Sequence, residues 1–208
     1  MVENGAKQDD ELAIINLQNN IMTGEWEKVV EMYERHQIIA ISARINTSGD
    51  TALHVAVSMA PEDMVDKLVR VITKYSEFGL WTKNNKGNTP LHVAATTRRF
   101  FICVLLAEKL EKSEVQGLVL EDLFRNNAGE SPHFLAASHG QKPNFLCLQY
   151  FLGGSPDSNH SQSNSFYRRN DGETILHCAI RWEHFGEHFF HFTYPLYCIF
   201  FFFLVFYI

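Results

Sequence analysis

The stretch that decides the fold is GNTPLHVAA, at residues 87–95. A polar turn is expected at residues 84–88, which overlap the start of this stretch. The asparagines and the glycine there tolerate the backbone angles that tight turns require. Thr89 can then cap a helix, and Pro90 suits its first turn. Leucine and small alanines follow on one face. The stretch therefore predicts a tight turn that leads into a short helix packed closely against its neighbours.

The same pattern recurs along the chain. The copies are GDTALHVA at 49–56, GNTPLHVAA at 87–95, GESPHFLAA at 129–137 and GETILHCA at 172–179. Their first glycines lie 38, 42 and 43 residues apart. In the third copy, His133 and Phe134 stand where Leu and His are expected, and we predict that the core repacks around them.

A second helix is expected after each motif, because apolar residues recur there at helical spacing. These residues are Met64, Val65, Leu68, Val69 and Ile72, and then Phe101, Ile102, Leu105, Leu106 and Leu110. Near the N-terminus, residues 12–22 predict another helix, and Gly24 marks the turn that follows it. The next apolar face is Trp26, Val29, Val30, Met32 and Tyr33.

The repeated motif resembles the ankyrin repeat, whose signature is Thr-Pro-Leu-His-x-Ala in a turn followed by two antiparallel helices. The resemblance implies an all-α solenoid of four to five units. The spacing here exceeds the usual ~33 residues, so we expect inserted loops at 113–123 and 153–165. The expected domains are an N-terminal cap with a degenerate first repeat at 1–45, ankyrin repeats at 46–188 with motifs starting near 49, 87, 129 and 172, and a hydrophobic tail at 189–208.

Composition limits the classes of function. Of the 208 residues, 46% are hydrophobic, which is ample for a core. The 18 basic and 24 acidic side chains give a net charge of −6, which argues against a nucleic-acid partner. The first 30 residues lack a secretory signal, so we expect reducing cytosol and free thiols.

The histidines invite a catalytic or metal-binding interpretation. His54, His92 and His177 occupy the motif position, where the resemblance implies hydrogen bonds between neighbouring turns. His184, His188 and His191 share a helical face that would suit a metal. No HExxH motif, phosphate loop or serine elbow accompanies them. We therefore predict no enzyme activity, no cofactor and no metal.

Recognition of a protein partner remains as the predicted role. Ankyrin stacks bind partners with their turn tips and with the concave face of the inner helices, and stacked repeats make one extended surface. The candidate contact residues at the turn tips are Asn84, Asn85, Lys86, Asn126, Asn127, Arg168, Arg169 and Asn170.

Longer stretches resemble one branch of ankyrin proteins. They are GEWEKVV at 24–30, FLCL at 145–148 and NDGETILHCAI at 170–180. The branch is the plant ankyrin-repeat membrane proteins of the accelerated-cell-death type, which carry a C-terminal PGG membrane domain. This resemblance implies defence or stress signalling at a membrane, with the plasma membrane as one candidate and the repeats facing the cytosol. No Pro-Gly-Gly sequence follows the repeats.

The tail at 189–208 bears on the location of the protein. It contains no Asp, Glu, Lys or Arg and is about as long as a membrane-spanning helix. One hypothesis is a transmembrane anchor. Another is a translated intron, because phenylalanine codons are T-rich, and the chain would then be a truncated product or a soluble cytosolic adaptor. Burial of the tail as the missing outer helix is disfavoured, since its apolar residues surround the whole helix.

Overall fold

In the computed structural model, helices follow one another as a stack of antiparallel pairs. The structure describes residues 2–113, 124–152 and 167–181. The α-helices are α1 (Val2–Thr23), α2 (Trp26–Arg35), α3 (Gln37–Ser42), α4 (Ala52–Met59), α5 (Glu62–Tyr75), α6 (Pro90–Thr96), α7 (Phe100–Glu111), α9 (Pro132–Ser138), α10 (Lys142–Leu152) and α11 (Ile175–Arg181), and η1 (Glu77–Trp81) is a 3-10 helix. The described residues form no strand beyond one isolated bridge between Arg168 and Thr174. The all-α prediction is confirmed.

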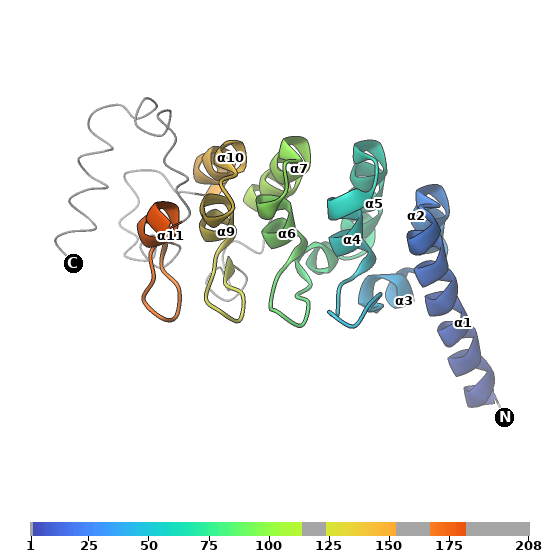
Figure 1. Cartoon of the computed structure of the whole chain (residues 1–208). Helices are drawn as coiled ribbons and strands as arrows, with labels where there is room; N and C mark the ends of the chain where they lie inside the picture. The colour runs from blue at the N-terminus through green and yellow to red at the C-terminus, as the bar shows by residue number, and fades with distance from the viewer. Residues whose placement is uncertain (1, 114–123, 153–166, 182–208) are drawn as a thin grey trace.

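Pairs of helices lie side by side along the solenoid, and the turns that connect them extend from one side of the stack (Figure 1). The inner helices α4, α6, α9 and α11 pack in sequence against one another, and α7 packs against both α5 and α10. The α1–α2 pair lies against the start of this array, as expected for an N-terminal repeat. Helix α1 begins earlier than the predicted residue 12.

Local sequence explains where the inner helices begin. Thr51 and Thr89 are extended N-cap residues, and each forms a reciprocal capping box with the motif histidine three positions later. Pro90 and Pro132 occupy the first turns of α6 and α9, where a missing N–H costs nothing. Ser131 caps α9 by accepting a hydrogen bond from the backbone of Phe134. The inner helices α4, α6 and α9 therefore each begin at the same position of the motif.

Small residues allow the inner helices to approach closely. Ala52, Ala56, Ala94, Ala95 and Ala136 have no exposed surface. The predicted apolar face of the outer helix α5 is confirmed, because all five of its residues are buried: Met64, Val65, Leu68, Val69 and Ile72. A continuous core runs from Leu17 to Leu148, and a smaller cluster joins Phe134, Ala137, Ile175 and Cys178.

One residue of the predicted apolar faces is exposed. The ring of Phe101 in α7 is 70% exposed, although the helical spacing placed it on the apolar face. Helix α7 is apolar around most of its circumference, so periodicity alone cannot tell which side meets the neighbouring repeats. Ile102, Leu106 and Leu110 fill that interface instead. The predicted repacking around His133 and Phe134 is confirmed, since both are buried.

Candidate functional site: the turn row

The turns at 46–50, 84–88, 126–130 and 169–173 follow one another along one side of the solenoid, and we call them the turn row (Figure 1). Each of the first three is closed by an asparagine side chain. The Oδ1 of Asn84 accepts hydrogen bonds from the backbone N–H groups of Lys86 and Asn88, both at 3.0 Å. Asn126 repeats this geometry with Ala128 and Glu130 at 3.0 and 2.9 Å. The turns thus hold their own shape.

Adjacent turns are then joined by hydrogen bonds, and we call each set of such bonds a rung. In the last three turns, the asparagine at the second position donates twice to the preceding turn, once from its backbone and once from its amide. Asn85 donates to the carbonyl oxygens of Ser48 and Thr47, both at 3.0 Å. Asn127 donates to Lys86 at 3.0 Å and Asn85 at 2.9 Å, and Asn170 donates to Ala128 at 3.2 Å and Asn127 at 3.3 Å. The rungs fix the register of the whole row.

A second series of bonds runs through basic side chains. Arg44 donates to the carbonyl of Lys83 at 2.9 Å, Lys83 donates to Arg125 at 2.9 Å, and Arg125 donates to Arg168 at 2.9 Å. Each cation therefore reaches the backbone of the next turn. Of these four residues, only Arg168 was named as a candidate from the sequence, and Arg44, Lys83 and Arg125 were not. The available signal was a basic residue four positions before Gly87, Gly129 and Gly172.

The spacing between turns leaves room only for glycine. Gly87 has a φ of 77°, a left-handed conformation that L side chains rarely adopt. A Cβ placed there would lie 2.4 Å from Oδ1 of Asn127 and 2.7 Å from its backbone nitrogen. Gly24, between α1 and α2, has a similar φ of 76° but open space around it. The motif glycine thus serves both the turn and the contact with the next turn.

The histidines of the first two motifs, His54 and His92, form a further part of the first two rungs. In His92, Nδ1 accepts from the backbone N–H of Thr89 at 3.2 Å, so the proton of the neutral ring lies on Nε2. That Nε2 faces the carbonyl oxygens of Phe124 and Glu130, each at 3.2 Å. Burial lowers the pKa of His92 to about 3 and also lowers that of His54. The imidazoles are neutral structural donors.

The third and fourth motifs depart from this scheme. Phe134 replaces the histidine, and the guanidinium of Arg169 lies 5.9 Å from its ring centre. Arg169 also pairs with Glu130 at 3.5 Å and with Glu173 at 3.0 Å. Ion pairs and a cation–π contact of Arg169 therefore join the last two repeats, whereas a histidine hydrogen bond joins the earlier repeats. His177 is exposed, and its Nδ1 bonds to the backbone and hydroxyl of Thr174 in its own motif.

The eight predicted contact residues occupy three kinds of environment. Asn126 is buried, and Asn84 and Arg169 are half-buried within the rungs. Asn85, Asn127 and Asn170 are exposed at the turn tips while their amides hold the rungs. Lys86 and Arg168 are exposed. A role for these eight in contacting a partner stays a prediction.

The sequence predicted buried, free cysteines and identified one cluster of histidines that could suit a metal. Cys103, Cys147 and Cys178 are free and buried, as their apolar surroundings in the sequence indicated. Within 2–113, 124–152 and 167–181, no three His, Cys, Asp or Glu side chains gather as a metal site would require. The predicted helical face of His184, His188 and His191 lies outside the described residues, as does the tail at 189–208.

This geometry defines a helical-repeat solenoid protein with a continuous row of turns. Residues 28–117 match the family model described as ankyrin repeats (3 copies), so ankyrin repeats are present in this chain. No curated protein matches the chain. Ankyrin repeats bind protein partners and are typically non-catalytic, so the chain contains a protein–protein interaction module and no enzyme family is indicated. Among the described helices, none is long and apolar enough to cross a membrane.

Proposed function

We propose that the turn row and the adjoining face of the inner helices bind a protein partner. The observation that carries the proposal is the unbroken set of rungs from Thr47 to Asn170, which holds polar tips in one register before any partner arrives. A surface ordered in advance loses less conformational entropy on binding than a set of free loops. The row is therefore suited to specific recognition.

Apolar surface is available beside the turns. Val55 of α4 and Val93 of α6 occupy the same motif position and are half-buried. The exposed cation Lys86 lies at the tip of the second turn, and the exposed cation Arg168 directly precedes the fourth turn. An apolar strip bordered by charged, ordered turns combines the burial and the polar rim that protein interfaces use.

Photo-crosslinking in cells tests this surface. A photoreactive amino acid is introduced at Lys86 in the turn row and, as a control, at Lys67, an exposed residue of the outer helix α5. We expect one discrete crosslinked protein from position 86 and none from position 67. Crosslinks of equal yield from both positions, or from position 67 alone, would contradict the proposal.

We further propose that this recognition serves defence or stress signalling at a membrane, with the repeats in the cytosol. Support comes from the resemblance of residues 24–30, 145–148 and 170–180 to the plant ankyrin membrane proteins. A soluble ankyrin adaptor is equally compatible with the repeats. Alkaline extraction of membranes separates the two, because an anchored chain stays in the pellet and release of the whole protein would contradict anchoring.

Sequencing of the transcript complements the extraction. We expect a continuous message through the codons for residues 183–208 if the tail is genuine. Removal of the phenylalanine tract by splicing, with the frame continuing, would show that the tail is translated intron and would refute the anchor.

A further inference from the structure

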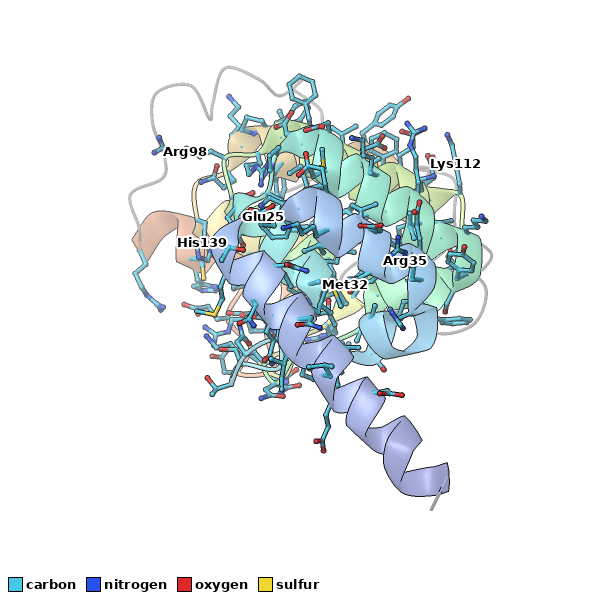
Figure 2. All side chains as sticks on the ribbon, turned by 90° about the vertical axis from the view of Figure 1, so that its right-hand side faces the viewer. Glu25, Met32, Arg35, Arg98, Lys112 and His139 are labelled. Atoms are coloured by element: carbon cyan, nitrogen blue, oxygen red, sulfur yellow. The ribbon has the colours of Figure 1, made fainter. Side chains whose placement is uncertain are left out.

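An open cavity of about 520 Å³ lies between two helix–helix connections, α6 to α7 and α9 to α10. Its walls come from Arg98, Phe100, His139, Gly140, Gln141, Pro143 and Asn144. These connections join the ends of the inner helices that lie away from the turn row. Figure 2 places the labelled Arg98 and His139 on the same side of the molecule. The cavity is thus a separate feature from the surface proposed above.

The floor of the cavity is held rigidly. Asn144 is only 2% exposed, and its amide donates to the carbonyl oxygens of Ala94, Ala95 and Thr97 at 3.1, 3.3 and 2.7 Å. These carbonyls lie at the end of α6, so one side chain ties the two connections together. Preorganised walls reduce the entropy that a ligand must overcome.

The charge around the cavity has one sign. Arg98 is exposed at the mouth, and the part of the chain that the structure describes gives its guanidinium no carboxylate partner. Among the described residues, no aspartate or glutamate lines the cavity. Helices α7 and α10 both begin here, and neither has an acid in its first turn, whereas α5 has Glu62 and Asp63. The N-terminal ends of their dipoles add to the positive potential of Arg98.

Apolar surface accompanies this charge. The ring of Phe100 is 39% exposed beside Pro143. A volume of about 520 Å³ exceeds what one carboxylate fills and falls in the range of sites that bury several groups. The cavity therefore suits an anionic group with an apolar neighbour.

We infer that this cavity binds an acidic side chain of a protein partner, with an adjacent apolar side chain of the same segment against Phe100 and Pro143. Arg98 forms the charge-assisted hydrogen bond, bidentate where geometry allows, and His139 borders the same opening. This inference rests on the proposed function, since it names a second contact on the partner. It gives the solenoid a recognition site outside the turn row.

A peptide selection supplies a defined ligand for the test. A displayed library of random dodecapeptides is selected on the full chain, and affinities of the enriched peptides are measured by fluorescence anisotropy. We expect enrichment of an Asp or Glu next to an apolar residue. Arg98→Glu should weaken these peptides at least tenfold, and exchanging the peptide acid for lysine should restore binding to that variant.

The matched control is Lys67→Glu, which makes the same charge change on the exposed face of α5. Its affinities should equal those of the wild-type chain. Because Arg98 is exposed and no carboxylate of the described ranges pairs with it, its variant should unfold at the same temperature as the wild type. Equal melting points would show that lost binding is not lost folding.

Other results would overturn the inference. Peptides without acidic enrichment, or with the same affinity for the Arg98→Glu variant, would exclude the cavity as their site. Displacement of every peptide by millimolar inorganic phosphate would indicate a general anion site instead. Peptides weakened by Lys86→Glu but not by Arg98→Glu would refute the cavity and support the turn row, so the two proposals fail separately.

Discussion

The buried histidine of the second motif offers a quantitative test of the rungs. His92 has no exposed surface and forms hydrogen bonds with the backbone and hydroxyl of Thr89 and, through Nε2, with two carbonyls of the next turn. His177 occupies the same motif position, but it is exposed, and within the described residues its ring bonds to Thr174 of its own motif and to no other motif. Comparing variants of these two histidines therefore separates the stability that comes from the bond within a motif from the stability that comes from the bonds to the next repeat.

The expected magnitudes follow from these contacts. His92→Ala removes about three buried hydrogen bonds worth about 1 kcal/mol each, and leaves carbonyls without a donor. The lost ring adds a cavity term. We expect the free energy of unfolding to fall by about 3–4 kcal/mol. His177→Ala should cost less than about 1 kcal/mol, because water replaces the lost partner at an exposed helix cap.

Urea unfolding followed by circular dichroism measures both variants. The two should have similar slopes against urea concentration and different midpoints. We expect the free energies of unfolding of the two variants to differ by at least about 2 kcal/mol. Equal losses in the two variants would show that the motif histidine acts only within its own turn, and the rungs would then contribute little to stability.

Three further predictions follow from other contacts. Burial lowers the pKa of His133 from 6.5 to about 4, so the unfolded chain binds a proton first and stability is lost as the pH falls from 6.5 to 4. The loss of stability is about 3 kcal/mol at pH 4. The drop in the urea midpoint between pH 7 and pH 4 should therefore be smaller for His133→Leu than for the wild type. The same drop in both proteins would contradict the lowered pKa of His133. Arg99 donates to carbonyls of Ala56 and Val57 at 3.2 and 3.0 Å, and also to Ala60, so Arg99→Ala should lower the melting temperature while Arg98→Ala leaves it within error. Gly24→Ala should lower the free energy of unfolding by the ~1–2 kcal/mol of left-handed backbone strain. Gly87→Ala should lower it by clearly more, because a methyl group there also meets Asn127. Equal losses for the two variants in calorimetry would refute the close contact.

Local features of the fold could be predicted from sequence because they depend on neighbouring residues. Thr89 and Pro90 define a helix start wherever that segment lies. The exposure of Phe101 could not be predicted in this way, since α7 is apolar on more than one side and only the positions of the neighbouring helices α5, α6 and α10 decide which side is covered. Arg99 and Asn144 were missed for the same reason. Their acceptors lie at the end of a helix in the preceding repeat.

The candidate site was only partly visible in the sequence. Polar residues at the tips of the turns followed from turn chemistry alone. Which amides hold the rungs depends on the register between turns, so Asn126 could not be told from Asn127 before the structure placed one inside and one outside. The cavity beside Arg98 arises from two connections far apart in the chain, and no motif marks it.

Hydrogen–deuterium exchange in the presence of the crosslinked partner measures which surface of the chain recognises that partner. The chain is compared free and in complex with the protein captured through position 86. We predict slower exchange in the turns at 84–88 and 126–130 and on the inner helix α6, with the outer helix α5 unchanged. Protection confined to α5 and α7, with the turn row unaffected, would contradict the claim that the turn row is the recognition surface.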